Sequence, residues 1–401
     1  PNLQSAPQDT LIPGNLGNRL EAKVNKPAIV NWFCYKKSEQ WFSLWINLNM
    51  LLPVLVDCWI DNIRLVYDRT TRRSSNSPGV QVRVPGFGQT YPVEFLDNNR
   101  LTGYFHTMVN HLVNMGYVRN ETVRSAPYDW RLAPNENVEY FQQLKDLVEE
   151  MYEQHQHPVY LLGHSMGCHY TLYFLNHQPQ TWKDKYIKGF ISLGAPWGGA
   201  VKALRVLASG NNDGVPMISN MKIREEQRMT VTNLWLLPLQ SVRAKDHVFI
   251  STPTFNYTGQ DYNRFFMDIG FEDGWYMWED TKNLTGDLQA PGVEVWCMYG
   301  VGLPTPVTYI YDEKFPDEDP VDYVYADGDD TVDSLSMSLC KRWVGEQDKP
   351  VHVTEYRGLP HLDIVYNEKV LTQIQQILEG ISETPEEIDA RPDTRGKRTG
   401  N

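Results

Sequence analysis

PVYLLGHSMGCHYTLYFL, residues 158–175, is the stretch that decides the fold. Its first five residues form an apolar run that predicts a β-strand, and its last part predicts an apolar helix that stops before Pro179. Between them, Gly163-His164-Ser165-Met166-Gly167 matches the pattern G-x-S-x-G. Such a pentapeptide can arise by chance, but a strand before it and a helix after it favour a nucleophile elbow. The stretch therefore predicts Ser165 as the nucleophile of an α/β-hydrolase, with positive potential from the helix N-terminus close to its hydroxyl.

Regular elements on either side extend this pattern. Tyr140–Met151 carries apolar residues at the spacing of one helix face, and Tyr186–Leu193 is a second strand candidate. The order helix, strand, turn, helix, strand is typical of a parallel sheet with right-handed crossovers. Val293–Met298 and Val351–Tyr356 are further strand candidates, and Asn367–Leu378 is a helix candidate. We therefore predict the α/β class with an α/β-hydrolase fold.

Composition limits the function classes. The 401 residues carry a formal net charge of −13, which argues against a nucleic-acid partner because a phosphate backbone requires a basic footprint. The best apolar run, Met50–Val56, is much shorter than the roughly 18 residues of a membrane span and contains Pro53. We expect a polar tail over residues 1–10, one hydrolase domain over 11–380, and a disordered tail over 381–401, where Glu, Pro, Thr, Arg and Gly dominate.

Two internal segments lack a regular pattern. Thr70–Pro78 is polar, basic and rich in serine, so it predicts a surface loop. Gly210–Gln240 begins with Gly and Asn and continues into a charged run. This composition predicts a mobile excursion from the sheet.

A serine hydroxyl needs a base, and this fold supplies it after the acid in the chain order Ser, Asp or Glu, His. Outside the elbow's own helix, the histidines after Ser165 are His247, His352 and His361. His352 alternates within a strand candidate, where a structural role is expected. His361 follows Gly358-Leu359-Pro360 in a turn ahead of the last helix. A loop above the sheet is where a catalytic imidazole must lie, so we favour His361.

The acid is expected in Ala326-Asp327-Gly328-Asp329-Asp330-Thr331-Val332. A calcium loop of the EF-hand type is excluded, because the twelfth position counted from Asp327 is Ser338 where such a loop needs glutamate. A solvated acidic turn remains an alternative. Spacing alone leaves Asp327, Asp329 and Asp330 open.

An oxyanion hole requires two backbone N–H groups aimed at the developing negative charge. Met166, the residue after the nucleophile, supplies one. The turn Pro13-Gly14-Asn15-Leu16-Gly17 is the candidate for the other, with Asn15 as donor. A simple tight turn is an equal alternative there.

Cysteines and sequons indicate the compartment. The cysteines are Cys34, Cys58, Cys168, Cys297 and Cys340, and none has the C-x-x-C spacing of zinc or redox sites, so we predict no metal site. An odd number leaves at least one thiol free or paired outside the chain. Glycosylation sequons occur at Asn120, Asn256 and Asn283. Disulfides together with glycans would indicate an oxidising route.

The segment between Cys34 and Cys58 is dense in large apolar side chains. Candidates for surface contact are Trp41, Phe42, Trp45, Leu48, Leu51 and Leu52. Such density normally indicates core. A closed loop that presents Trp and Leu can instead rest on a lipid surface, and composition leaves both interpretations open.

Longer strings are more specific than the elbow. They are Leu20-Glu21-Ala22-Lys23, Val56-Asp57-Cys58-Trp59-Ile60-Asp61-Asn62, Val84-Pro85-Gly86-Phe87-Gly88, Ala126-Pro127-Tyr128-Asp129-Trp130-Arg131 and Ser192-Leu193-Gly194-Ala195-Pro196-Trp197-Gly198-Gly199. With them the chain resembles the lecithin–cholesterol acyltransferase family from about Leu11 to Gly380, with a lysosomal phospholipase/transacylase as a close relative. Residues 299–306, 308–312 and 327–332 look like the plasma acyltransferase, whereas 133–137 and Met166 lean towards the lysosomal relative.

The resemblance implies roles and pairings for residues of this sequence. It implies Ser165 as nucleophile, Asp329 as acid and His361 as base. The implied disulfides are Cys34–Cys58 and Cys297–Cys340, which leave Cys168 free and facing the pocket rim. It also implies a membrane-binding insertion over residues 34–62 and a cap region over 200–315 whose lid runs from Gly210 to Asn233. The mammalian acyltransferases have a second free cysteine where this chain has Asn15. This difference leaves the backbone N–H of residue 15 in place as an oxyanion donor.

The implied activity is transfer of the sn-2 acyl chain of phosphatidylcholine to the 3β-hydroxyl of cholesterol through an acyl-serine, with phospholipase A side activity. The expected setting is a lipoprotein surface in blood plasma, reached by peripheral membrane contact of a secreted monomer. No cofactor is expected, and apolipoprotein A-I is the expected protein activator. The alternatives are a lysosomal phospholipase/transacylase with ceramide-like acceptors, and a catalytically inactive hydrolase fold that binds lipid.

Overall fold

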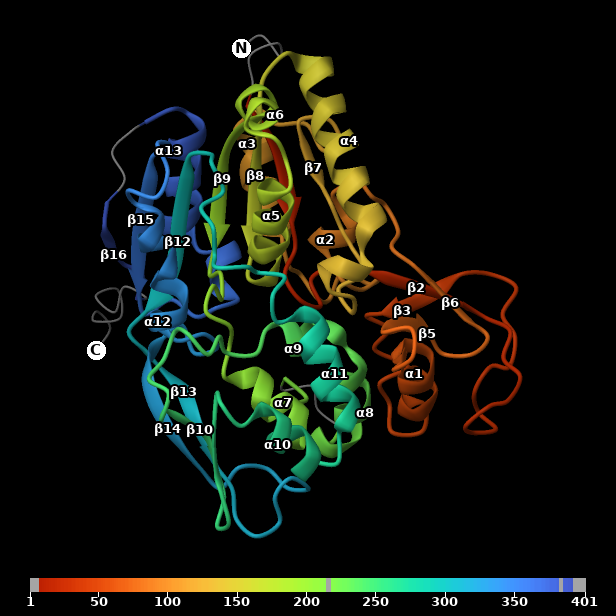
Figure 1. Cartoon of the computed structure of the whole chain (residues 1–401). Coiled ribbons are helices and arrows are strands. Elements are labelled where there is room, and N and C mark those ends of the chain that lie inside the picture. Colours follow the sequence, from red (N-terminus) through yellow and green to blue (C-terminus); the bar gives the residue numbers. More distant parts are fainter. Residues whose placement is uncertain (1–6, 214–217, 382–384, 392–401) are drawn as a thin grey trace, which may run out of the picture.

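The structure, a computed structural model that describes residues 7–213, 218–381 and 385–391, is organised around a seven-stranded sheet (Figure 1). Each pair of neighbouring strands is parallel. This arrangement confirms the predicted α/β-hydrolase fold. In spatial order the strands are β16 (Glu387–Asp389), β15 (Val351–Arg357), β12 (Val295–Val301), β9 (Ile187–Leu193), β8 (Val159–His164), β1 (Gln8–Ile12) and β7 (Val123–Ser125).

Helices cover both faces of the sheet, which explains why β8 is apolar without alternation. Val159 and Leu161 belong to the core cluster shared with α4 (Val138–His155) and α5 (Met166–Asn176). Tyr160 and Leu162 belong to the cluster shared with α3 (His106–Asn114) and α13 (Glu368–Leu378). A short helix, α6 (Gln180–Tyr186), leads into β9. The helix and strand candidates of the sequence around the elbow are thus confirmed.

A cap lies beyond the carboxyl ends of the strands (Figure 1). It contains helices and a separate four-stranded sheet in the order β11-β10-β13-β14. Its elements are α7 (Lys202–Ser209), α8 (Asn220–Met229), α9 (Val231–Trp235), β10 (Val248–Ser251), β11 (Asn256–Thr258), α10 (Tyr262–Asp268), α11 (Glu272–Thr281), β13 (Leu303–Ile310) and β14 (Asp322–Gly328). A short helix, α12 (Ser334–Met337), follows β14.

An insertion between β1 and β7 projects to the right beside the cap, with its helix α1 next to α8 of the cap (Figure 1). A three-stranded sheet in the order β3-β2-β6 and a two-stranded β4–β5 hairpin support its helix α1. The elements are β2 (Leu20–Val24), β3 (Phe42–Trp45), α1 (Val56–Ile63), β4 (Leu65–Asp68), β5 (Arg73–Asn76), β6 (Val80–Arg83) and α2 (Tyr91–Glu94). None of the helices in the described parts of the chain is long and apolar enough to cross a membrane.

The predicted boundary of the N-terminal tail, at residue 10, is wrong, because β1 begins at Gln8. The strand is paired on both sides, with β7 and with β8, so backbone pairing holds a polar segment inside the sheet. Gln8, Asp9 and Thr10 are fully buried, and the Gln8 side chain donates to the His157 carbonyl at 2.8 Å. Burial raises the pKa of the Asp9 carboxyl to about 8. Residues 1–6 lie outside the described residues.

Other boundaries also differ from the sequence prediction. The C-terminal tail expected to be disordered contributes β16, which pairs with β15, while residues 382–384 and 392–401 lie outside the described ones. The cap expected over residues 200–315 is not continuous, because β12 returns to the central sheet. The loop expected at Thr70–Pro78 contains β5 of a hairpin. At the C-terminus, pairing with a strand distant in the sequence overrides a polar composition, whereas Thr70–Pro78 is ordered by a local hairpin with β4.

Candidate active site

The nucleophile elbow is built where β8 turns into α5. Ser165 adopts φ 53° and ψ −125°, a backbone conformation that few side chains tolerate and that nucleophile elbows require. A Cβ on Gly163 would lie 3.1 Å from Cys168 Cα, and one on Gly167 would lie 2.4 Å from the Ile12 and Pro13 carbonyl oxygens. A side chain at either position would crowd the neighbouring backbone, which explains why glycines stand on both sides of the elbow.

Three side chains from distant loops converge at this elbow. The Ser165 hydroxyl lies 2.9 Å from His361 Nε2, and His361 Nδ1 lies 2.6 Å from Asp329 Oδ2. Asp329 is 1% exposed, and its other carboxylate oxygen accepts the amides of Val332 at 2.7 Å and Thr331 at 3.1 Å. The His361 amide also donates to the Asp329 carbonyl at 2.8 Å. With Nδ1–H donated to the carboxylate, Nε2 is left to accept the serine proton, which is the arrangement of a Ser-His-Asp triad.

The rejected candidates have other partners. His352 Nε2 lies 2.9 Å from a Glu294 carboxylate oxygen, and His247 Nε2 lies 3.0 Å from the Val307 carbonyl. Asp327 accepts the Gly302 amide at 2.7 Å, and Asp330 accepts the Thr331 hydroxyl at 2.7 Å. Of the three aspartates that spacing left open, only Asp329 reaches His361.

The turn predicted to supply the second oxyanion donor lies against the elbow. A Cβ on Gly14 would lie 3.1 Å from Ser165 Cβ, and Asn15 lines the same cavity as Ser165. Met166 is the first residue of α5, so its N–H has no acceptor within the helix. The structure thus places both predicted amides beside the nucleophile.

The triad opens into a largely apolar cavity of about 530 Å³. The parts of the chain that form its wall include the Gly-rich turn, the insertion, α7, the lid, and the loops that carry Asp329 and His361. Their residues include Asn15 and Leu16, then Trp45, Leu51 and Trp59, then Ile218, Ile223, Glu226, Gln227, Thr230 and Asn233, and finally Leu362 and Asp363. A cavity with this lining accommodates apolar chains next to a reacting ester.

The predicted lid contributes to this wall as helix rather than as an irregular excursion. Residues 220–235 form α8 and α9, while 214–217 lie outside the described residues. α8 contacts α1 of the insertion, with ion pairs Lys222–Asp57 and Arg64–Glu225, the latter at 3.4 Å. Within the wall, burial raises the pKa of the Glu226 carboxyl to about 7, and the Thr230 hydroxyl donates to it at 2.6 Å.

The predicted membrane contacts separate into two groups. Trp45 and Leu51 are 8% and 4% exposed and line the cavity, and Trp45 Nε1 donates to the Leu16 carbonyl at 2.8 Å. Leu48 and Leu52 are each 38% exposed, while Trp41 and Phe42 are half-buried. The prediction of Trp45 and Leu51 as membrane contacts is therefore wrong, since both side chains are buried at the cavity and Trp45 bonds the oxyanion turn. Sequence analysis missed a more exposed group on either side of Cys34: Val30, Trp32, Phe33 and Tyr35.

Both disulfides implied by the resemblance are present, Cys34–Cys58 and Cys297–Cys340. Cys168 is free, but it does not face the pocket rim as expected. It is fully buried between α5 and the sheet, with Sγ 3.8 Å from the Leu193 carbonyl. Burial raises the pKa of this thiol, so the structure gives it a packing role.

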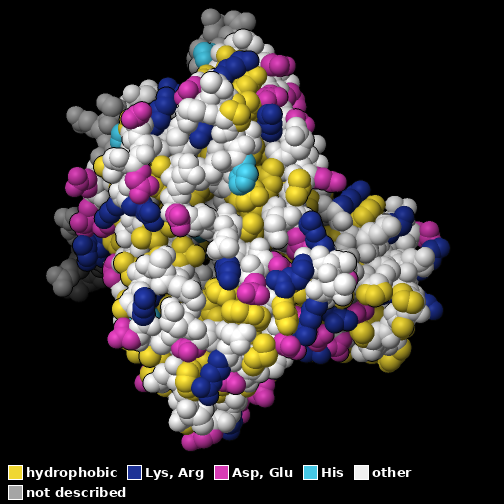
Figure 2. Space-filling model, viewed as in Figure 1, with side chains coloured by type: hydrophobic (Ala, Val, Ile, Leu, Met, Phe, Trp, Pro, Cys, Tyr) yellow, Lys and Arg dark blue, Asp and Glu magenta, His cyan; other side chains and the backbone are white. Residues whose placement is uncertain are grey.

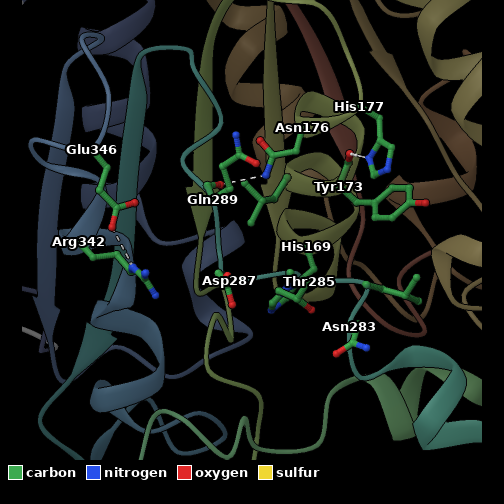
Figure 3. A pocket seen from close by; sticks show the side chains of 13 residues that line it. His169, Tyr173, Asn176, His177, Asn283, Thr285, Asp287, Gln289, Arg342 and Glu346 are labelled. Atoms are coloured by element: carbon green, nitrogen blue, oxygen red, sulfur yellow. Dashed lines mark hydrogen bonds and ion pairs between the residues drawn. The ribbon is translucent and has the colours of Figure 1, made fainter.

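All three sequon asparagines are exposed: Asn120, Asn256 and Asn283. Asn283 lies beside a second cavity of about 570 Å³ along α5, which Figure 3 shows with His169 and Asn176 projecting from that helix. No described residue of that cavity belongs to the triad. Glycan attachment at the three sites stays a prediction.

Two residues that sequence analysis did not single out lie next to the triad: Tyr104, which also lines the cavity, and His164. His164 precedes the nucleophile in the elbow and is 3% exposed, and Tyr104 precedes α3 and is 6% exposed. The only signal in the sequence is the histidine at the variable position of G-x-S-x-G.

Comparison with known proteins adds independent evidence. The family model "Lecithin:cholesterol acyltransferase" matches residues 41–368. The chain is 60% identical over 372 residues to chicken (Gallus gallus) phosphatidylcholine-sterol acyltransferase, covering 93% of this chain and 90% of that protein. It is 58% identical to the human enzyme of that name, covering 92% and 84%. It is 52% identical to the human lysosomal phospholipase A and acyltransferase, covering 93% and 91%.

Proposed function

Since the chain belongs to the lecithin:cholesterol acyltransferase family, we propose that it transfers an acyl chain from phosphatidylcholine to cholesterol. The observation that carries this proposal is the hydrogen-bonded chain Ser165–His361–Asp329 at the base of a largely apolar cavity. An apolar cavity favours lipid substrates, and a triad favours acyl transfer through a covalent acyl-serine.

In the first half-reaction Ser165 Oγ attacks the sn-2 ester carbonyl while His361 Nε2 removes its proton. The Asn15 and Met166 amides stabilise the oxyanion of the tetrahedral intermediate. Asp329 stabilises the imidazolium, which then protonates the departing lysophosphatidylcholine oxygen. An acyl-serine remains.

In the second half-reaction the 3β-hydroxyl of cholesterol gives its proton to His361 and attacks the acyl-serine. When the second tetrahedral intermediate collapses, the His361 imidazolium gives its proton to the departing Ser165 Oγ, which releases cholesteryl ester and restores the Ser165 hydroxyl. Water can take the place of the sterol and give phospholipase A activity. The apolar wall and the lid favour the alcohol by lowering the local water activity.

The acceptor assay tests this proposal. The protein is incubated with phosphatidylcholine vesicles that contain cholesterol or N-acylsphingosine, at pH 7.4 and at pH 4.5. We expect cholesteryl ester as the main transfer product at pH 7.4. Predominant acylation of N-acylsphingosine at pH 4.5 would instead assign the lysosomal type of activity, which the 52% identity to that enzyme favours as the second candidate. No product together with no fluorophosphonate labelling would indicate an inactive lipid-binding fold.

The setting of the reaction is part of the proposal. Two disulfides are typical of an extracytoplasmic protein, which supports action on a lipoprotein surface outside the cell. Activation by apolipoprotein A-I and a monomeric state are proposed on the family relationship alone.

The insertion is proposed to supply the membrane contact. Its exposed apolar side chains include Trp32 at 78%, Tyr35 at 76% and Val54 at 56%, and Figure 2 shows apolar side chains gathered on this projecting part. Trp32 and Phe33 lie together, with ring centroids 3.6 Å apart. Since tryptophan favours the headgroup level of a bilayer, we assign this group rather than Trp45 to the lipid surface.

The double variant Trp32→Ala/Phe33→Ala is expected to bind phosphatidylcholine vesicles about 10²- to 10⁴-fold more weakly, because each of the two aromatic side chains contributes about 1.5–3 kcal/mol when it is buried in the lipid. Hydrolysis of a soluble short-chain ester should stay unchanged. Vesicle flotation and the ester assay measure the two effects. Tyr325→Ala, a 54% exposed aromatic on β14, is the matched control. Equal weakening by the control, or loss of soluble-ester activity, would contradict the assignment.

A further inference from the structure

A second chain of hydrogen bonds runs next to the triad. The Gly14 amide donates to the Tyr104 hydroxyl at 3.0 Å, and that oxygen lies 2.6 Å from His164 Nδ1. On the other side of the ring, His164 Nε2 lies 3.1 Å from the carbonyl oxygen of His361. Three parts of the site are joined in this way: the oxyanion turn, the elbow and the loop that carries the base.

The end groups of this chain fix one proton. A backbone amide can only donate and a carbonyl can only accept, so the His361 carbonyl requires a proton on His164 Nε2. If the ring is neutral, Nδ1 carries no proton and accepts from the Tyr104 hydroxyl, whose oxygen accepts from the Gly14 amide. A protonated ring would donate from Nδ1 as well, and the Tyr104 proton would then have no partner in this chain. The neutral form in this one tautomer therefore uses every donor of the chain.

The surroundings favour that neutral form. Burial lowers the pKa of His164 to about 3, with the nearby His361 as the second cause. The titratable rings that face His164 are Tyr104 and His361, with centroids 5.6 Å and 5.1 Å away. When His361 takes the serine proton during catalysis, a neutral His164 adds no second positive charge beside it.

The contacts also leave little freedom in the oxyanion turn. A Cβ on Gly14 would lie 3.1 Å from the His164 carbonyl oxygen and 3.3 Å from His164 Nδ1, so this turn packs directly on the ring. Asn15, the expected oxyanion donor, follows Gly14 immediately. The hydrogen bond from the Gly14 amide to Tyr104 therefore also orients the next peptide group, which carries the Asn15 N–H.

We propose that Tyr104 and His164 are positioning residues that hold the Asn15 amide and the His361 backbone at fixed places relative to Ser165. Neither side chain takes part in proton transfer to the substrate. This inference rests on the proposed acyl transfer by Ser165. Its effect is on the rate of the chemical step, because a displacement of about 1 Å in such a site costs about 100-fold in rate.

Tyr104→Phe tests the proposal, because it removes the hydroxyl and keeps the ring that packs on Phe105 and His164. We expect kcat for cholesteryl ester formation to fall about 10- to 100-fold, since an oxyanion donor is misplaced. Tyr104 also lines the lipid cavity, but phenylalanine keeps its ring there, so KM should stay within about threefold of wild type. Phosphonylation of Ser165 by a fluorophosphonate should slow by a similar factor.

Tyr262→Phe is the matched control. Tyr262 is 2% exposed, and its hydroxyl donates to the Pro238 carbonyl at 2.8 Å in the cap, away from the triad. Tyr262→Phe loses one buried hydrogen bond and Tyr104→Phe loses two, so the thermal unfolding midpoint should fall in both variants and further in Tyr104→Phe. Only Tyr104→Phe should lose kcat.

A pair of variants at His164 separates positioning from packing. His164→Gln retains an amide that can donate to the His361 carbonyl, whereas His164→Leu has no donor. We expect His164→Gln to retain at least fivefold more kcat than His164→Leu. Equal kcat in these two variants, or kcat in Tyr104→Phe within twofold of Tyr262→Phe, would overturn the proposal. An inactive wild-type protein would instead refute the proposed function.

Discussion

Ser165→Ala is expected to lower acyl transfer and hydrolysis by about 10⁶-fold, because a triad that lacks its nucleophile loses the whole covalent route. The Ser165 hydroxyl bonds His361 in the structure, and alanine can occupy the same elbow with a similar backbone. The fold should therefore persist. Release of lysophosphatidylcholine, formation of cholesteryl ester and fluorophosphonate labelling measure the loss.

Ser192→Ala is the control for this variant. Ser192 lies on β9 opposite Gly163, and its buried hydroxyl has no hydrogen-bond partner among the described residues. Its removal should leave activity within a few-fold of wild type. Transfer retained by Ser165→Ala at more than about 1% of wild type would refute the assignment of the nucleophile.

Asp329→Asn is expected to lower kcat by about 10⁴-fold, the size of effect seen when a triad histidine is held in the wrong tautomer. The amides of Thr331 and Val332 already donate to one carboxylate oxygen of Asp329. An asparagine would place its carbonyl oxygen there and turn its NH₂ towards His361 Nδ1. That nitrogen must then accept, so Nε2 carries the proton and cannot receive one from Ser165.

Asp327→Asn is the matched control, since it neutralises another carboxylate of the same loop. Asp327 is exposed and accepts the Gly302 amide, a bond that the asparagine oxygen can keep. We expect activity within a few-fold of wild type, measured as initial rates of cholesteryl ester formation across pH. A loss in Asp327→Asn as large as in Asp329→Asn would show that the acid has been assigned to the wrong residue.

Much of the hydrolase core could be predicted because local patterns carry it. An apolar run of strand length, a glycine-flanked serine and an apolar helix specify β8, the elbow and α5 within about 20 residues. The helix ahead of β8 and the helix after His361 follow from the spacing of their apolar residues. Polar Gln8–Thr10 gave no such signal, because pairing with two neighbouring strands, rather than apolar side chains, holds that segment inside the sheet.

In the insertion, by contrast, the sequence is dense in large apolar side chains, and the prediction failed on which of them are exposed. Trp45 and Leu48 have similar apolar character in the sequence, but Trp45 is buried against the oxyanion turn and Leu48 faces outwards. Composition measures how apolar a segment is and says nothing of which side chains meet the rest of the molecule. The exposed Trp32 and Phe33 were missed for the same reason.

The sequence by itself determined the class of fold, the nucleophile and the loop that carries the base, since these depend on periodicity and turn chemistry over a few neighbouring residues. Tertiary structure decided which aspartate serves His361, which aromatic side chains stay exposed, and that Tyr104 and His164 lie next to the triad. The physical reason is distance along the chain. Ser165 and His361 are 196 residues apart, and Tyr104 and His164 are 60 apart. Groups so far apart meet only where the register of the parallel sheet and the packing of the loops at its edge bring them together.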